Sequence, residues 1–169
     1  MNLRTIMTTC LMVLAVAGYA QRRQIGDART ILLRGKEFDK AEKMMTDLLK
    51  DTTNQNNKRI YDIWLQAVEK QYAQLNEKMY IKEKVDTAKL FTLTQRIFMV
   101  AERLDSIDMQ PDKKGKVSPE YRKDNAKRLS GYRPNLFYGG AYYVRKHNFS
   151  KAYDFFEMYI DCDRQPLFE

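Results

Sequence analysis

Apolar residues recur at helical spacing along most of the chain. Near the start, two stripes have members three or four residues apart, which places each stripe on one face of a helix. The first stripe holds Ile25, Ala28, Ile31 and Leu32, and the second holds Phe38, Ala41, Met45, Leu48 and Leu49. Residues 35–37, Gly-Lys-Glu, separate them. The pattern predicts two antiparallel helices joined by a tight turn.

Two longer stripes predict two longer helices in the middle of the chain. Ile60, Trp64, Ala67, Val68, Leu75 and Met79 share one face of a helix from about Asn57 to Ile81, and Leu90, Leu93, Ile97, Val100, Leu104 and Ile107 share one face of the next. Phe91 and Phe98 extend the second stripe to a neighbouring face, as expected for a helix packed between two others. Residues 109–118 have no apolar periodicity and predict an exposed loop.

A short helix is expected after this loop. Ser118 is able to cap a helix, and Pro119 suits the first helical position because proline has no amide hydrogen to leave unpaired. We expect this helix, residues 119–129, to end near Leu129, and residues 131–134 to form a turn or a kink. The pattern of helix pairs assigns this helix no partner.

The last third of the chain combines small and large residues in a way that predicts close helix packing. The small residues are Gly139, Gly140 and Ala152, and the large ones are Leu136, Tyr143, Phe149 and Phe156. Two antiparallel helices approach closely where one presents glycine or alanine and the other fills the notch with a bulky side chain. The sequence therefore predicts a tightly packed helix pair at residues 135–161.

The first helix pair is a weaker copy of the last. When Ala41 is aligned with Ala152, Phe38 falls on Phe149 and Met45 falls on Phe156, but Arg29 takes the place of Gly140. Ala41 and Ala152 are 111 residues apart, whereas three exact repeats of about 34 residues would place them about 102 apart. Long central helices and the loop after Met109 account for the surplus.

These features resemble the tetratricopeptide-repeat family, whose repeats are helix-turn-helix units. The repeat pattern covers residues 26–51 and 135–161. The segments at residues 105–108, 111–116, 132–136 and 139–140, together with an export leader, resemble secreted repeat proteins of Bacteroides-type bacteria. The resemblance implies an all-α fold in which about seven helices stack as antiparallel pairs into a right-handed α-solenoid.

The resemblance also implies a concave groove, lined by the first helix of each repeat, that holds a protein or peptide partner. In the last repeat the groove positions would be Phe137, Tyr138, Ala141, Val144 and Arg145. Aromatic and arginine side chains suit a protein interface, although Phe137 and Tyr138 also suit packing on the preceding helix. The positions expected to pack the repeats together are Phe38, Ala41, Met45, Leu136, Gly139, Gly140, Tyr143, Phe149, Ala152 and Phe156.

The first 20 residues have the pattern of a removable secretion signal. Arg4 precedes an apolar run from Ile6 to Ala17, and the small residues Gly18 and Ala20 stand where a signal peptidase cleaves. The run is shorter than the roughly 20 residues that span a bilayer. We therefore expect residues 1–20 to be a signal peptide and residues 21–169 to be one helical repeat domain, exported to the periplasm or cell envelope, with no transmembrane segment.

Charge and cysteine content narrow the function further. The formal charge of the chain is +8, and removing Arg4 with the leader leaves +7. The basic residues are interspersed with acidic ones, which favours a solvated surface, and we expect no nucleic-acid partner. Only Cys162 remains after the leader, so neither an intrachain disulfide nor a cysteine-based metal site is expected.

The sequence offers little support for catalysis. His147, the only histidine, falls in a predicted turn. The pairs Asp105 with Asp108 and Asp161 with Asp163 are interpreted as solvated helix ends, and Cys162 as a small apolar filler. No phosphate-binding loop, dinucleotide fingerprint, nucleophile elbow or zinc spacing occurs. We expect no enzyme activity, no cofactor and no metal.

Three functions are therefore considered. The leading hypothesis is an exported, non-enzymatic scaffold that binds protein partners. The others are the periplasmic sensor part of a larger signalling protein and a glycan-capture protein built on repeat helices. The apolar residues near the C-terminus, Leu167 and Phe168, suggest that further repeats follow, and the chain is expected to expose apolar surface and self-associate.

Overall fold

The computed structural model describes the backbone of residues 3–168 and the side chains of residues 19–168. Within these residues the fold is all-helical, as predicted. The α-helices are α1 (Leu3–Arg34), α2 (Phe38–Leu48), α3 (Lys58–Tyr80), α4 (Thr87–Asp108), α5 (Arg122–Arg145) and α6 (Phe149–Asp161), and the short 3-10 helices are η1 (Thr52–Asn54), η2 (Cys162–Arg164) and η3 (Pro166–Phe168).

Polar side chains fix the starts of several helices. The side-chain oxygens of Asn57, Asp86 and Asn148 accept hydrogen bonds from backbone amides in the first turns of α3, α4 and α6, respectively. The turn between α1 and α2 uses positive φ angles at Gly35 (74°) and Glu37 (56°). The predicted turn at residues 35–37 and the predicted bounds of α3 are thus confirmed.

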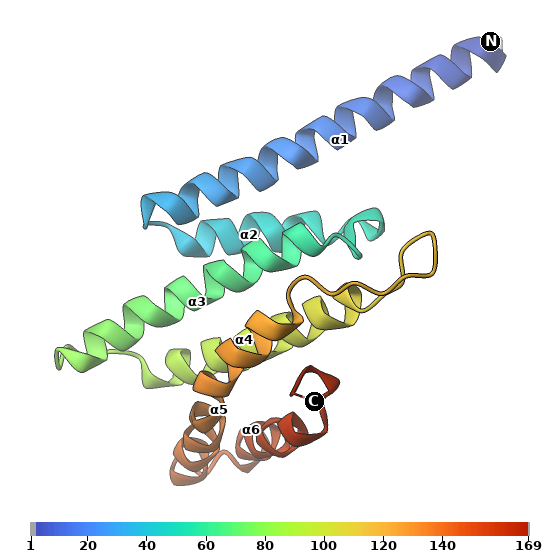
Figure 1. Ribbon diagram of the computed structural model, residues 1–169. Coiled ribbons are helices and arrows are strands. Elements are labelled where there is room, and N and C mark those ends of the chain that lie inside the picture. The colour runs from blue at the N-terminus through green and yellow to red at the C-terminus, as the bar shows by residue number, and fades with distance from the viewer. Residues whose placement is uncertain (1–2, 169) are drawn as a thin grey trace.

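The helices follow one another through space in chain order (Figure 1). Short connections make hairpins of α1 with α2, α3 with α4, and α5 with α6. Each hairpin packs against the next one, since α3 contacts both α1 and α2, and α4 contacts α5. The chain therefore builds one continuous stack of helix pairs.

Side chains link corresponding helices of successive pairs. Between α3 and α5, the hydroxyl of Tyr72 accepts a 2.9 Å hydrogen bond from Asn135. Between α2 and α4, Arg96 is 2.8 Å from a carboxylate oxygen of Glu42. These two contacts connect the second hairpin with the third through α3 and α5, and the first hairpin with the second through α2 and α4.

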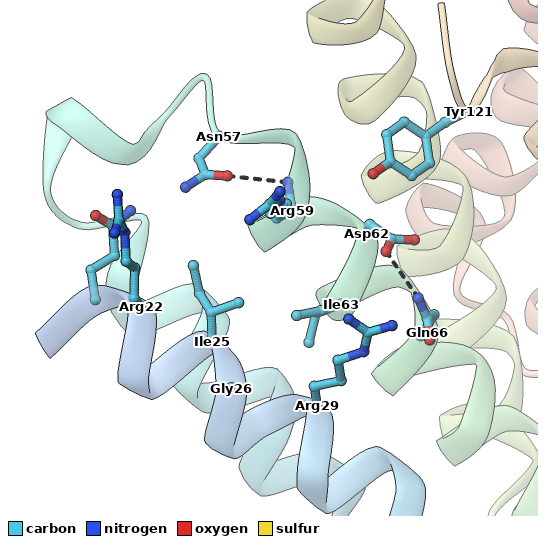
Figure 2. A pocket seen from close by; sticks show the side chains of 11 residues that line it. Arg22, Ile25, Gly26, Arg29, Asn57, Arg59, Asp62, Ile63, Gln66 and Tyr121 are labelled. Atoms are coloured by element: carbon cyan, nitrogen blue, oxygen red, sulfur yellow. Dashed lines mark hydrogen bonds between the residues drawn. The ribbon is translucent and has the colours of Figure 1, made fainter. Parts of the chain in front are cut away.

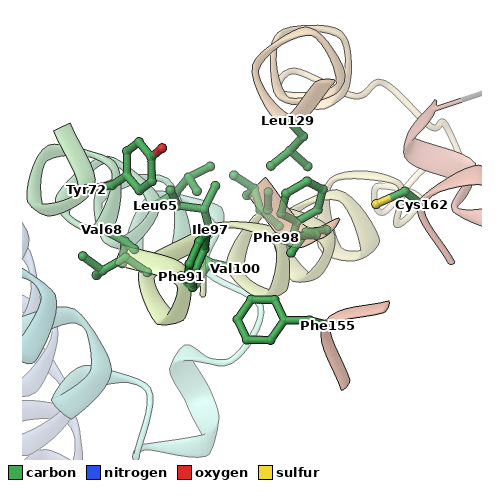
Figure 3. Close-up of a cluster of buried hydrophobic side chains, with 14 of the residues drawn as sticks. Leu65, Val68, Tyr72, Phe91, Ile97, Phe98, Val100, Leu129, Phe155 and Cys162 are labelled. Atoms are coloured by element: carbon green, nitrogen blue, oxygen red, sulfur yellow. The ribbon is translucent and has the colours of Figure 1, made fainter. Parts of the chain in front are cut away.

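Apolar packing forms two adjoining clusters. The smaller one joins α1, α2 and the start of α3, and the larger one joins α3 to α6 (Figure 3). Leu49 and Trp64 contact both clusters. The largest fully buried side chains include Phe98, Phe155 and Met45, so the core is continuous along the stack.

The expected short helix at residues 119–129 is wrong. The helix begins at Arg122 rather than after Ser118 and continues through Pro134 to Arg145 as one helix, α5. Pro134 is tolerated because it and Ser130 are both exposed, so the carbonyl of Ser130, which loses its helical partner, faces water. This merger also explains why residues 3–168 contain six α-helices rather than the seven or so expected.

The predicted leader, residues 1–20, lies largely outside the residues whose side chains are described. Its backbone from Leu3 onward belongs to α1, which continues unbroken to Arg34. Among the described side chains of α1, Gln21 is the first with a hydrogen bond to another element, 2.6 Å from Nε2 to Oδ1 of Asn54. In the described part of the chain, no helix combines the length and apolar character needed to cross a membrane.

Candidate functional site

An open groove of about 890 Å³ lies between α1 and α3 (Figure 2). Its walls come from α1 and α3, which are the first helices of the first two hairpins, and Tyr121, which precedes α5, lies at one end. The lining residues are Gln21, Arg22, Ile25, Gly26, Arg29, Asn57, Arg59, Asp62, Ile63, Gln66 and Tyr121.

The α1 wall presents one helix face to the groove. Arg22, Ile25, Gly26 and Arg29 are spaced by three, four and seven residues, so they lie on the same side of the helix. Ile25 is half-buried against the apolar cluster, whereas both arginines are exposed. At Gly26 an added Cβ atom would meet nothing within 4 Å, so this part of the wall is recessed.

The α3 wall repeats this spacing. Arg59, Asp62, Ile63 and Gln66 share one face of α3. Ile63 is buried and, with Ile25, supplies the apolar floor. A carboxylate oxygen of Asp62 accepts a 3.0 Å hydrogen bond from Nε2 of Gln66.

The groove carries an excess of positive charge. Three arginines line it, Arg22, Arg29 and Arg59, against the single carboxylate of Asp62. None of the ion pairs formed within the described part of the chain involves these three arginines. Their guanidinium groups are therefore able to bind an anionic group from outside the chain.

Two buried carboxylates hold the end of the groove in place. Asp108 is fully buried and lies 2.8 Å from Nζ of Lys58, and it accepts a 2.7 Å hydrogen bond from the amide of Tyr121. Asp105 accepts two hydrogen bonds from Arg122, at 2.8 and 2.7 Å. Together these contacts tie the starts of α3 and α5 to the end of α4.

The interpretation of Asp105 and Asp108 as solvated helix ends is therefore wrong. Both side chains are buried because the loop after α4 returns and brings Arg122 and Tyr121 against them. Such an interaction depends on residues more than ten positions apart, which periodicity does not reveal. The functional consequence is a fixed position for Tyr121 at the mouth of the groove.

Burial and hydrogen bonding together set the pKa values of Asp108, Lys58 and Tyr121. Burial on its own would raise the pKa of Asp108, but hydrogen bonds from Lys58 and from the amides of Tyr121 and Glu120 hold that pKa below its ordinary value. The hydrogen bond with Asp108 raises the pKa of Lys58. Burial, followed by the negative charge of Asp62, raises the pKa of the Tyr121 hydroxyl. Near neutral pH, Lys58 and Asp108 are both charged and Tyr121 is neutral.

The residues expected from the repeat resemblance to line a partner groove do not line the groove between α1 and α3. The structure places Phe137, Tyr138, Ala141, Val144 and Arg145 on the part of α5 near α6, and none of them lines the large groove. Phe137 is 49% exposed, and its ring lies 5.7 Å from that of Phe156 and 5.8 Å from that of Tyr159. Together with Tyr138 it lines a smaller hollow of about 250 Å³.

Most of the expected packing positions are enclosed by the helix pairs. Phe38, Ala41, Met45, Leu136, Gly139, Gly140, Tyr143 and Ala152 are buried, and Phe156 is half-buried. Phe149 differs, because its side chain is 64% exposed. It follows the N-cap of α6 directly, and its ring lies against His147 in the turn instead of between the helices.

The two central glycines of α5 lie under phenylalanine rings of α6. A Cβ atom added at Gly139 would come within 2.6 Å of two ring carbons of Phe155, and one at Gly140 within 2.5 Å of the ring of Phe156. Separations under 3.0 Å essentially never occur for a real Cβ atom. Only glycine fits these positions without a shift of the opposing ring.

The residues considered for catalysis are not assembled into a site. His147 is exposed in the turn before α6, and Cys162 is buried, with the pKa of its thiol raised to about 11, chiefly by burial. Within the described residues, no group of three or more histidine, cysteine, aspartate or glutamate side chains is arranged to hold a metal ion.

Sequence reasoning missed the arginines of the groove. Arg22 and Arg29 lie on α1, and Arg59 is distant from them in sequence, so no local motif joins them. The available signal was their position beside apolar stripes, since each arginine stands three or four residues from Ile25 or Ile63.

Comparisons with protein-family models, curated proteins and solved structures find no match for this chain.

Proposed function

We propose that this protein is a non-enzymatic, exported scaffold that binds a protein segment in the groove between α1 and α3. The observation that carries the proposal is the open groove of about 890 Å³ with an apolar floor and arginines that form no ion pair within the described part of the chain. Grooves of this kind, formed between helices of a rigid stack, suit extended peptide segments.

The finer fold assignment belongs to the same proposal. The order of the hairpins, the side-chain contacts between successive hairpins, and the glycine notches of the last pair support a tetratricopeptide-like right-handed α-solenoid. In such a stack the first helices line the concave face, and α1 and α3 are first helices of their pairs. The groove therefore lies on the surface that this fold uses for partners.

The chemistry of the groove favours binding over catalysis. Its acidic group, Asp62, is hydrogen-bonded to Gln66, and the lining includes neither histidine nor cysteine. The sole tryptophan, Trp64, donates a hydrogen bond from its indole nitrogen to Glu42 between α2 and α3. A stacking platform for sugars is thus less well supported than a peptide site.

The proposal is tested by selecting peptides from a random phage-displayed library on the purified protein. A matched pair of variants locates the binding: Gly26→Trp fills the recess of the groove, and Gly131→Trp adds the same side chain to exposed α5. At both glycines a new Cβ meets nothing within 4 Å, so both variants are expected to fold.

Selected peptides are expected to lose binding to Gly26→Trp and to retain it with Gly131→Trp. Two results would contradict the proposal. One is a library that yields no binders after repeated selection. The other is a set of binders that Gly26→Trp leaves unchanged and that Phe137→Ser weakens, which would move the site to the aromatic hollow at α5.

A further inference from the structure

We infer that the groove recognises acidic segments, with carboxylate side chains of the partner paired to Arg22, Arg29 and Arg59. This inference rests on the proposed function and specifies the chemical class of its partner. It starts from the charge of the lining, where three arginines face one carboxylate. A basic partner would meet a net repulsive groove, whereas an acidic one neutralises charges that no group of the described chain pairs.

The positions of the arginines fit an extended chain. Arg22 and Arg29 are seven residues apart on α1, a rise of roughly 10 Å at 1.5 Å per residue. In an extended polyproline-like segment, three residues cover roughly 9 Å and return a side chain to the same face. Acidic residues at positions i and i+3 of the partner are therefore able to contact both arginines at once.

The space between the two arginines determines what lies between the carboxylates. Ile25 and Ile63 form an apolar floor there, and Gly26 leaves the α1 wall recessed. An apolar side chain between two acidic residues fits this floor. The favoured partner is thus an acidic segment interrupted by leucine or isoleucine, rather than a uniformly charged polymer such as a nucleic acid.

The third arginine is held on rigid support. Arg59 follows Lys58, whose Nζ is 2.8 Å from buried Asp108, and its amide donates a hydrogen bond to the N-cap side chain of Asn57. Asp108 also binds the amide of Tyr121 at the same end of the groove. This end is therefore preformed, so binding of the partner costs little entropy for ordering it.

Asp62 allows a test in which the affinity for an acidic partner should rise rather than fall. Its carboxylate is the only negative charge in the lining, and Gln66 donates a hydrogen bond to it. Asparagine retains an acceptor for that bond and removes the charge. Asp62→Asn is therefore expected to bind an acidic partner more tightly, whereas most surface substitutions weaken binding or leave it unchanged.

The experiment measures fluorescence anisotropy of a labelled peptide with glutamates at i and i+3 and leucine between them. A second peptide carries lysine in place of each glutamate, and a single-stranded oligonucleotide of equal charge serves as competitor. Each single change of Arg22, Arg29 or Arg59 to Gln is expected to weaken binding of the glutamate peptide roughly 2–5-fold. Asp62→Asn is expected to strengthen its binding by a similar factor. Arg103→Gln, on an exposed position of α4 outside the groove, is the matched control and is expected to change nothing.

Binding that falls with added salt and follows this order of variants supports the inference. The inference is overturned if the lysine peptide binds as tightly as the glutamate peptide, or if a variant with all three arginines changed to Gln binds like wild type. It is also overturned if the oligonucleotide displaces the labelled peptide at a lower concentration than the unlabelled glutamate peptide does. Library peptides that bind the groove without acidic residues would overturn this inference and leave the proposed function standing. A library without binders would remove both.

Discussion

The contact between α5 and α6 allows a sharp prediction about stability. Alanine at an exposed glycine within a helix stabilises the folded state by about 1 kcal/mol, because alanine has the higher helix propensity. At Gly139 the new methyl would instead lie 2.6 Å from two carbons of the Phe155 ring. That ring is 1% exposed and stacked on Tyr143 at 5.4 Å, so it has no free space to enter.

Overpacking of this kind costs about 1–3 kcal/mol, and it outweighs the gain in propensity. We expect Gly139→Ala to lower the free energy of unfolding by up to about 2 kcal/mol, which is the overpacking cost less the gain in propensity. Gly140→Ala is expected to cost less, about 0–1 kcal/mol, because the half-buried Phe156 is able to rotate toward solvent. Gly131→Ala, on the same helix with nothing near its Cβ, is the control and should stabilise by about 1 kcal/mol.

Urea denaturation followed by circular dichroism measures all three variants. The expected order of stability is Gly131→Ala, wild type, Gly140→Ala, Gly139→Ala. The double variant Gly139→Ala with Phe155→Leu separates overpacking from other causes, because the smaller leucine leaves room for the new methyl group. The double variant should therefore lose less stability than the sum of the losses of the two single variants. If Gly139→Ala proves as stable as Gly131→Ala, the close approach of α5 and α6 at this glycine is incorrect.

Two further predictions concern carboxylates on α4, the half-buried Glu102 and the buried Asp108. Burial and the nearby charge of Asp161 raise the pKa of Glu102 to about 6, so the stability that its protonated form contributes is lost as pH rises through that value. After allowance for solvent screening, Glu102→Gln should therefore raise the free energy of unfolding by about 1 kcal/mol near pH 8 and have little effect near pH 4. Urea melts at a series of pH values measure both effects. The pKa of Asp108 is instead lowered, so the stability that its charge contributes is present at neutral pH and is lost as pH falls through its folded-state pKa. Asp108→Asn removes charge-assisted hydrogen bonds and should cost about 2–3 kcal/mol at pH 7. The stability difference between wild type and variant should shrink in acid, and a difference that stays constant with pH would refute the pairing with Lys58.

Sequence periodicity was sufficient to predict most of the helical elements, α5 being the exception. The stripe beginning at Ile60 corresponds to α3, and the stripe from Leu90 to Ile107 lies within α4. These helices form because each buries an apolar face, and the spacing of apolar residues within each segment reveals that face. The glycines at 139 and 140 were equally informative, since small residues opposite large ones indicate that two helices cross closely.

The errors have a common physical origin in long-range contacts. The start of α5 depends on Asp108 binding the amide of Tyr121 from another helix, and a capping rule applied to Ser118 has no access to that bond. Pro134 indicated a break, yet it lies on the exposed side of α5, where a missing hydrogen bond is replaced by water. The groove arose in the same way, from arginines of two helices that become neighbours only after folding.

None of the positions predicted on α5 lines the groove proposed as the binding site. The expected positions on α5 are rich in aromatic residues, and the aromatic rings of α5 and α6 do gather, but they surround the small hollow rather than the large groove. Composition favoured aromatic residues because they dominate protein interfaces. The groove relies on charge and shape, which depend on how α1 and α3 are placed relative to each other.

The central claim is that the groove between α1 and α3 receives the partner. The most direct measurement is a map of backbone amide chemical-shift changes on addition of a selected peptide to isotope-labelled protein. The account predicts that the largest changes fall at residues 21–29 and 57–66 and at Tyr121, with small changes along the second half of α5. Largest changes at residues 137–145, with residues 21–29 unaffected, would contradict it.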